Sequence, residues 1–302
     1  MLTPLRTLSL AVLTIAVAGC SGTASSTPPP PSTTSSGTST EAPSGNPDFG
    51  AIEHPTGATD VILRFEEGDG FVMPAWLATQ APAFTLYGDG TIIFRNPKLD
   101  PLEPIGSVNP MRSFRTARLS EGQTQQVLAD ALGEGGLGVA RPDYPNAQIS
   151  DASTAVFTIN AGGFKKTVSI YALGLEMDGM ADGRARAVFA KLAERLTNID
   201  ENGAFATAEY APDQYRGILL EGQPGVPDAK PWPWSGIAPA GFVSNGDPNA
   251  FQIPSRVMSV AEVEALGITV YQGGLQGLTL IGPGDGKVYS FSLRPLLPGE
   301  VS

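Results

Sequence analysis

Three carboxylates framed by glycines are the first candidates for chemistry in this chain of 302 residues. Gly-Asp-Gly occurs at 68–70, 88–90 and 284–286. Acids in glycine-rich loops are typical either of metal-binding loops or of tight turns. None of the triplets is followed by the further spaced oxygen ligands that a metal loop requires, and each borders strand-like sequence. We therefore interpret Asp89 and Asp285 as turn residues. The triplet at 68–70 is doubtful as a hairpin turn, because a proline follows it closely.

The segment 198–209, NIDENGAFATAE, is the best-spaced candidate for calcium. It follows a predicted helix and fills positions 1, 3, 5, 6, 8 and 12 of an EF-hand-like loop with Asn198, Asp200, Asn202, Gly203, Phe205 and Glu209. However, position 1 is asparagine, Ala206 offers no ligand at position 9, and Pro212 blocks an exiting helix. We favour a helix end that runs into a polar linker, with calcium as the alternative, and we predict no metal and no cofactor.

Carboxylate catalysis needs no rare residue, since a glycosidase requires only two carboxyl groups about 5–10 Å apart. The chain has 30 acidic residues, and the densest cluster is Glu66, Glu67 and Asp69. We favour a solvated turn after an edge strand for this cluster. A carboxylate-dependent hydrolase stays open as the alternative.

Other catalytic sets are missing. His54 is the single histidine, lies near the start of the folded part, and is expected at the surface or at a strand edge. The chain has no Gly-x-Ser-x-Gly elbow, no Ser-x-x-Lys motif and one cysteine, Cys20. Nucleophilic catalysis with a histidine base, cysteine catalysis and a zinc site are therefore excluded. We assign no catalytic residue and favour a protein that is not an enzyme.

Two tryptophans in the loop KPWPWSG at 230–236 are the best candidates for contact with a ligand. Trp232 and Trp234 are able to form an aromatic platform for a sugar or a proline-rich peptide. Paired tryptophans in such a loop more often fix it to the core. We keep both residues as speculative ligand contacts.

Hairpins and helices alternate along the sequence. Residues 83–94, 154–173 and 277–296 are predicted hairpins, and Asp89-Gly90 predicts a type I′ turn with positive φ at both residues. Two helices are expected to begin at capping boxes, Ser120 with Gln123 and Ser259 with Glu262. A third helix, 181–199, is expected to be capped by Asp182.

Adjacent hairpins argue for an α+β fold of antiparallel β-hairpins with two or three helices packed on one face. We predict one hairpin-helix-hairpin-helix unit at 49–200 and a second, smaller α+β unit at 201–302. This prediction leaves two arrangements open: the second unit has its own sheet, or it shares a sheet with the first.

The first 48 residues have a different composition from the rest. Residues 1–19 hold one positive charge, Arg6, and an apolar run too short to span a membrane, which is the layout of an export signal. Val17-Ala18-Gly19-Cys20 resembles the lipobox of bacterial lipoproteins, which implies that Cys20 carries the lipid. Residues 20–48 are rich in Ser, Thr and Pro and are predicted to be a disordered tether.

Charge narrows the choice of partners. The formal net charge is −11, and the sequence has no basic cluster, so we expect no nucleic-acid binding. We expect contact with a membrane only through the lipid, because peripheral attraction to anionic headgroups needs basic residues.

The segments FTLYGDGTIIF, ISDASTAVFTINAGGFKKTVSIYALG and GLQGLTLIGPGDGKVYSFSLRPLLP resemble exported lipoproteins of Gram-positive bacteria with GC-rich genomes. The order of elements between about 84 and 198 is similar to a domain of unknown function in such proteins. The resemblance implies a location at the cell membrane, on its extracytoplasmic face, and implies no activity. We therefore expect a non-catalytic binding or accessory protein of the cell envelope, with a protein or glycan ligand. The alternative is a hydrolase of envelope glycans.

Overall fold

The computed structural model describes residues 50–300 except 69, 71–72, 96–101, 176–178, 202, 204, 224, 226–227, 245–252 and 285. Contacts between Cα atoms separate residues 49–302, as one compact unit, from residues 1–48. The predicted export signal, Cys20 and the predicted tether therefore lie outside the described residues, as do Asp69 and Asp285.

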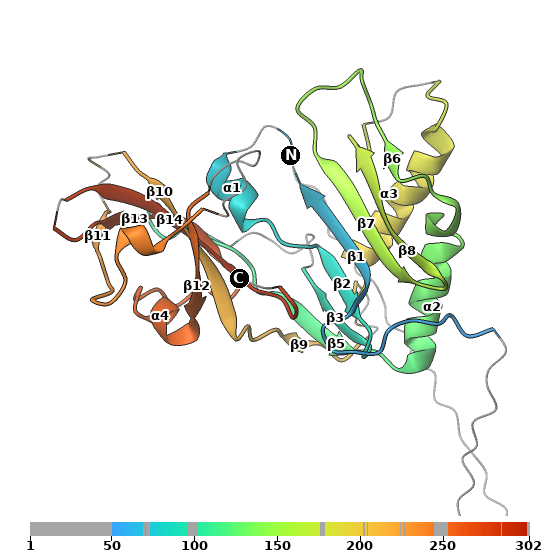
Figure 1. Cartoon of the computed structure of the whole chain (residues 1–302), viewed down its shortest axis with the longest axis horizontal. Helices are drawn as coiled ribbons and strands as arrows, with labels where there is room; N and C mark the ends of the chain where they lie inside the picture. Colours follow the sequence, from blue (N-terminus) through green and yellow to red (C-terminus); the bar gives the residue numbers. More distant parts are fainter. Residues whose placement is uncertain are drawn as a thin grey trace, which may run out of the picture. The chain divides into compact units, whose positions relative to one another are not determined.

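An eight-stranded sheet has the strand order β6-β8-β7-β1-β2-β3-β5-β9 (Figure 1). Its neighbours are antiparallel, apart from the parallel pair β6–β8. Its strands are β1 (Val61–Gly68), β2 (Phe84–Tyr87), β3 (Thr91–Phe94), β5 (Arg115–Arg118), β6 (Asp143–Tyr144), β7 (Thr154–Ala161), β8 (Phe164–Tyr171) and β9 (Ala208–Glu209).

The second sheet has the order β11-β13-β14-β10-β12, and β4 (Asn109–Pro110) also pairs with β13. Its strands are β10 (Gln214–Glu221), β11 (Lys230–Pro231), β12 (Ser255–Ser259), β13 (Leu275–Ile281) and β14 (Val288–Pro295). Pairing crosses the predicted division at residue 200 in both directions, since β4 joins the second sheet and β9 joins the first. The division into two units itself stays a prediction.

Four α-helices occur in the described residues, and with two largely antiparallel sheets they confirm the α+β class. They are α1 (Pro74–Thr79), α2 (Glu121–Leu132), α3 (Gly183–Thr197) and α4 (Val260–Glu264); the short 3-10 helices are Leu137–Val139 and Pro239–Gly241. Figure 1 shows α2 and α3 on the same face of the large sheet. Helix α1 was not predicted from the sequence.

The main core fills the space between the large sheet and the two long helices. The side chains of strand β7 alternate between the two faces of the sheet, with Ala155, Phe157, Ile159 and Ala161 all buried. The Phe157 ring stacks on Phe65 of β1 with 4.8 Å between centroids, and it also contacts Phe189 of α3. Because β-strand side chains alternate between the two faces, the other face of the sheet is free to contact the second half of the chain.

A smaller apolar cluster lies on that other face. Its buried residues are Tyr87, Ile93, Phe114 and Leu297. Leu297 follows the last strand, β14, so the C-terminal segment of the chain packs on the large sheet. The hydroxyl of Tyr210 donates a 3.0 Å hydrogen bond to the carbonyl of Leu296 and holds the same segment.

The two predicted capping boxes are present, but the predicted cap of α3 is not. Ser120 and Ser259 each accept from the backbone N–H three residues on, and Gln123 and Glu262 accept in return. Asp182 occupies the N-cap position of α3, but its side chain makes no cap hydrogen bond. That carboxylate is used instead in ion pairs with two arginines, described below.

The predicted type I′ turn at Asp89-Gly90 is wrong. Gly90 has φ +85°, but Asp89 is not among the non-glycine residues with positive φ. The loop is a three-residue turn, in which Gly90 N–H donates to Tyr87 O and Thr91 N–H donates to the Asp89 carboxylate. Three-residue hairpin loops need only one left-handed residue. The Gly162-Gly163 turn, with φ of +60° and +77°, has the two left-handed residues that a type I′ turn requires.

The expected turn after an edge strand at Glu66-Glu67 is also wrong. Both residues belong to β1, which lies inside the large sheet between β7 and β2. Glu67 accepts a 2.6 Å hydrogen bond from the Ser153 hydroxyl. The first half of β1 is mostly apolar and the second half carries the two carboxylates. The apolar half alone does not show whether the strand continues through the acids or ends before them.

Candidate functional site

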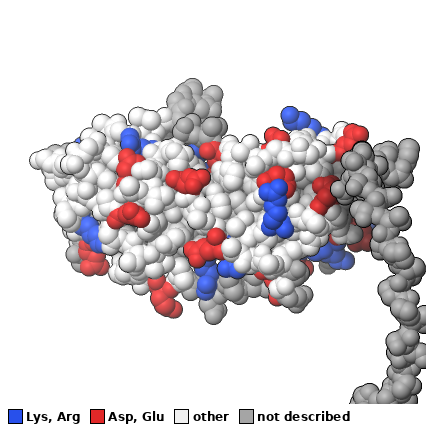
Figure 2. Space-filling model, turned by 90° about the horizontal axis from the view of Figure 1, so that it is seen from below, with Lys and Arg blue, Asp and Glu red and all other residues white. Residues whose placement is uncertain are grey.

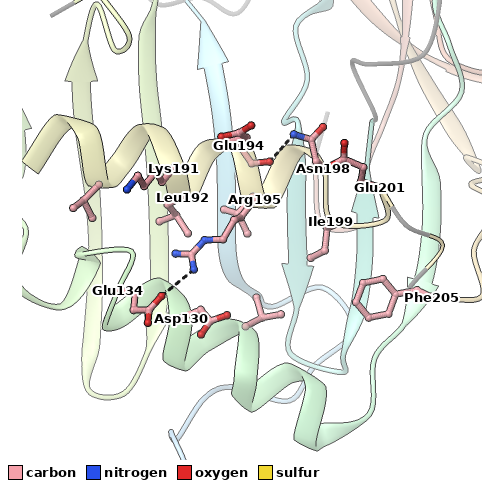
Figure 3. Close-up of a pocket in the computed structure, with 13 residues that line it drawn as sticks. Asp130, Glu134, Lys191, Leu192, Glu194, Arg195, Asn198, Ile199, Glu201 and Phe205 are labelled. Carbon is pink, nitrogen blue, oxygen red and sulfur yellow. Dashed lines mark hydrogen bonds and ion pairs between the residues drawn. The ribbon is translucent and has the colours of Figure 1, made fainter.

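A groove of about 660 Å³ lies between α2 and α3 (Figure 3). We call it the helix groove. Its apolar lining is Val127, Val188, Leu192, Leu196, Ile199 and Phe205. Leu192 and Leu196 are buried, whereas the other four are partly exposed. The groove arises because the two helices cover the sheet side by side and leave apolar side chains between them accessible.

The rim of the helix groove is charged. It carries four carboxylates, Asp130, Glu134, Glu194 and Glu201, and two cations, Lys191 and Arg195. Arg195 of α3 forms an ion pair of 3.5 Å with Glu134, which follows α2, so one contact spans the groove (Figure 3). The carboxylates outnumber the cations, so the rim attracts positively charged groups.

The segment that was a calcium candidate forms part of this groove. Asn198 donates from its side chain to the Glu194 carbonyl at the end of α3. Asp200 accepts from Phe205 N–H and from the Thr207 hydroxyl, at 3.2 and 3.3 Å. Glu209 lies in β9, which pairs with β5. Asn202 lies outside the described residues. Within the described part of the chain, no group of three or more His, Cys, Asp or Glu residues is placed to hold a metal.

A second hollow, of about 380 Å³, lies where the two sheets meet. We call it the arginine pocket. Its lining is Thr59, Val61, Arg64, Arg216, Arg294, Pro298, Gly299 and Glu300. Arg64 comes from β1 of the large sheet, whereas Arg216 and Arg294 come from β10 and β14 of the second sheet. Three guanidinium groups thus share a small space with one carboxylate.

Strand register places two of these arginines directly opposite each other. Arg216 pairs with Arg294 across the antiparallel strands β10 and β14. Like charges in such cross-strand positions destabilise a sheet. The pKa of Arg216 is lowered, first by burial and then by the positive charge of Arg294, while Glu300 opposes the shift.

The single carboxylate of the pocket is already used. Glu300 pairs with Arg294 at 2.7 Å, and the side chains of this pair are only 14% and 8% exposed. The same Glu300 oxygen accepts from Leu297 N–H at 2.9 Å. Arg64 is in a different state: its Nε is buried and has no hydrogen-bond partner among the described residues. Burial raises the pKa of the neighbouring Tyr87 hydroxyl, and the charge of Arg64 partly opposes that rise.

A fourth arginine, Arg186 of α3, is fully buried away from both hollows. Its terminal nitrogens donate to the carbonyls of Tyr171, Tyr144 and Pro145 at 2.7–2.9 Å. Its Nε lies 3.2 Å from a carboxylate oxygen of Asp182, whose other oxygen is 3.5 Å from Arg141. These contacts fix α3 to the ends of β6 and β8.

Trp232 and Trp234 are packed among core aromatics. Their rings meet edge to face at 5.0 Å, and Trp234 is 7% exposed and also contacts Phe242 and Phe291. Both indole N–H groups donate inside the fold, to Ile237 O and Glu262 O, at 2.6 Å. This placement matches the alternative in which the tryptophans fix the loop to the core. A ligand contact at Trp232, which is partly exposed, stays a prediction.

His54 was expected at the surface or at a strand edge; the residue is partly exposed, but its imidazole turns inward. That side chain is 4% exposed and lies 3.3 Å from Glu121 and 2.7 Å from the carbonyl of Pro55. The pKa of Glu121 is lowered, mainly by a hydrogen bond from Gln125 and further by His54. A lowered pKa does not suit Glu121 to act as a general acid, because a general acid needs a raised pKa.

Within the described part of the chain, no helix is long and apolar enough to cross a membrane. A scan against protein-family models, a search of curated proteins and a search of solved structures each find no match.

The arginine pocket was not predicted from the sequence, although the sequence holds one signal of it. Each arginine interrupts an apolar strand segment, in VILRF, YRGILL and FSLRPL. Arginine is almost never buried without a partner, so an arginine inside an apolar strand indicates either an internal ion pair or a binding site. Because these arginines are more than seventy residues apart in the sequence, no local pattern predicts that they line the same pocket.

Proposed function

We propose that the protein is a membrane-anchored, extracytoplasmic lipoprotein whose folded part binds a partner protein and catalyses no reaction. The lipobox-like residues up to Cys20, the export signal and the Ser/Thr/Pro-rich tether support the location. A lipid on Cys20 would hold the chain at the membrane without a transmembrane helix, and residues 20–48 would separate the folded part from the bilayer.

The observation that carries the binding role is the helix groove. It combines an apolar floor with a rim of four carboxylates and two cations. This chemistry fits a peptide segment that is apolar on one side and basic at its flanks, which is how an amphipathic helix enters a groove. The rim charges would speed and orient association, while the buried apolar area would supply most of the affinity.

The groove is less suited to hydrolysis of a glycan. A general acid must be held out of water, but the Glu134 side chain is 83% exposed and paired with Arg195. Glu194, on the other wall, is also exposed. If the protein were a hydrolase, it would turn over envelope polysaccharide, and Asp130→Asn or Glu194→Gln would reduce that turnover. Observing such turnover and its loss would contradict the proposal.

Binding is tested with two designed helical peptides, one of leucine and lysine and one of leucine and glutamate, titrated into the full chain. The Leu/Lys peptide should bind, more weakly as salt is raised, and the Leu/Glu peptide should not. Val188→Lys, in the groove, should weaken binding about tenfold or more, because it places a cation against a basic ligand. The matched control is Val139→Lys, at a valine that is 91% exposed outside the groove. Equal binding of both peptides, or no effect of Val188→Lys, would show that the groove is not this site.

The location is tested separately. Cys20→Ser should release the protein from the membrane fraction or leave the precursor uncleaved. If the variant is processed and fractionates as the unchanged protein does, the lipid anchor is not at Cys20.

A further inference from the structure

The two walls of the helix groove carry opposite charges next to its apolar floor. Asp130 and Glu134 line it from α2 and the turn that follows, whereas Lys191 and Arg195 line it from α3 (Figure 3). We propose that the partner is an α-helix with two different flanks, basic along α2 and acidic along α3. This inference rests on the proposed function and adds the acidic flank, so it narrows the class of partner.

On the α3 wall, the charges nearest the floor are the two cations. Lys191 and Arg195 are four residues apart, so they share one face of α3, next to Leu192 of the floor. Glu194 also lines the groove, but it precedes Arg195 by one residue and is therefore turned by about 100° around the helix. Figure 3 shows Glu194 and Glu134 on opposite sides of the α3 ribbon.

The charged residues of the α2 wall are both acidic. Asp130 is partly exposed in the last turn of α2, and Glu134 follows the helix with 83% of its side chain exposed. Asp130 accepts a 3.0 Å hydrogen bond from Gln126, one turn earlier on the same helix. Because Gln126 is neutral, this contact leaves the negative charge on the wall. The wall therefore attracts basic side chains of a bound helix.

One ion pair joins the two walls in the free protein. Arg195 and Glu134 are 3.5 Å apart, and their side chains are 42% and 83% exposed. An exposed pair of this kind contributes little to stability, because water and salt compete for both charges. A split-charge helix would exchange it at small cost, with a basic residue on Glu134 and an acidic residue on Arg195. A helix with two basic flanks would place a like charge beside Arg195 instead.

The floor sets the length of the bound helix. Its apolar residues on α3 are Val188, Leu192, Leu196 and Ile199. They extend over about 17 Å, at about 1.5 Å per residue, which corresponds to about three turns of a partner helix. Such a helix presents apolar anchors at i, i+3 or i+4, and i+7. In coiled coils, the charged residues beside such anchors set partner choice and orientation.

The test compares the Leu/Lys and Leu/Glu peptides with a third, the split peptide, in titrations of the full chain in a neutral detergent. All three have equal length and equal leucine positions, and the split peptide has lysine on one flank and glutamate on the other. At ~0.15 M salt, the split peptide should bind about fivefold or more tightly than the Leu/Lys peptide, since it replaces repulsion at Lys191 and Arg195 by attraction. Raising the salt should weaken the Leu/Lys peptide more, because it alone is attracted by the net charge of −11.

Reversing the charge of one wall should change the order of affinities. With Lys191→Glu and Arg195→Glu combined, both walls are acidic next to the floor, so the Leu/Lys peptide should bind more tightly than the split peptide. With Asp130→Lys and Glu134→Lys combined, both walls are basic there, and the Leu/Glu peptide should become the tightest ligand. The second variant serves if the first fails to fold.

The matched control is Lys165→Glu combined with Lys230→Glu, at two exposed lysines that do not line the groove. It has the same net charge as the variant of the α3 wall and should keep the preference for the split peptide. If the Leu/Lys peptide binds the unchanged protein as tightly as the split peptide, or if reversing a wall leaves the order unchanged, the inference is wrong while the groove remains a binding site. If no peptide binds, the proposed function is wrong and the inference falls with it.

Discussion

Arg186 and the arginine pocket are two places where the protein removes arginine side chains from water, and they differ in what surrounds the charge. Arg186 donates to three backbone carbonyls and lies beside Asp182. In the arginine pocket, Arg216 faces Arg294 across paired strands, and Glu300 is the carboxylate among the residues that line the pocket. In the first arrangement neutral carbonyl groups surround a single cation, whereas in the second three cations lie close together around one carboxylate.

This difference distinguishes two kinds of buried cation. A charge whose acceptors all come from the fold contributes to holding that fold together, because its removal leaves the acceptors without donors. A charge whose neighbours include other positive groups is held in place by the rest of the structure at a cost. Four substitutions test whether this distinction holds.

The largest effect is expected at Arg186. Arg186→Met keeps the aliphatic stem but leaves three carbonyls and Asp182 without their donor, so the free energy of unfolding should fall by about 3 kcal/mol or more. Chemical denaturation measures this change. Arg184→Met, two residues away on the exposed side of α3, should change stability by no more than about 0.5 kcal/mol. Similar values for both variants would mean that Arg186 is not structural.

A smaller loss is expected at Glu300. Glu300→Gln still accepts a hydrogen bond but leaves the pocket without its carboxylate, so unfolding in phosphate-free buffer should become easier by about 2 kcal/mol. The exposed Glu103→Gln is the control. A Glu300→Gln variant as stable as this control would show that the three positive charges do not strain the pocket.

Of the substitutions at Arg186, Glu300 and Asp182, the one at Asp182 should lower the free energy of unfolding least. Asp182→Asn removes the charge beside Arg186 and Arg141, but the three carbonyls remain, so we expect a loss of about 1 kcal/mol. Thermal unfolding against the exposed Asp143→Asn measures it. If Asp182→Asn costs as much as Arg186→Met, the carboxylate rather than the carbonyls holds the cation.

Local signals in the sequence predicted the parts of the fold that depend on neighbouring residues. The capping boxes at Ser120 and Ser259 and the hairpin at 154–173 are as expected, because each depends on a few adjacent residues. The turn at Asp89 was wrong because Asp-Gly fits both a two-residue and a three-residue loop, and only the register of β2 with β3 decides between them.

Contacts between distant segments were not predictable in the same way. Strand β1 lies between β2 and β7, which is ninety residues later, and no local pattern in VILRF specifies the second partner. The arginine pocket depends on the same long-range pairing and on the C-terminal segment that brings Glu300 to Arg294. The helix groove, in turn, requires knowing that α2 and α3 cover one face.

The most direct test of the distinction between the two arginine sites is the free energy of unfolding of Arg64→Met in phosphate-free buffer. Arg64→Met keeps the stem of the side chain and removes one of three crowded positive charges. We predict a stability equal to that of the unchanged protein within about 1 kcal/mol, or higher, because relief of repulsion offsets lost contacts. A loss as large as that of Arg186→Met would contradict the account and would make Arg64 a structural cation.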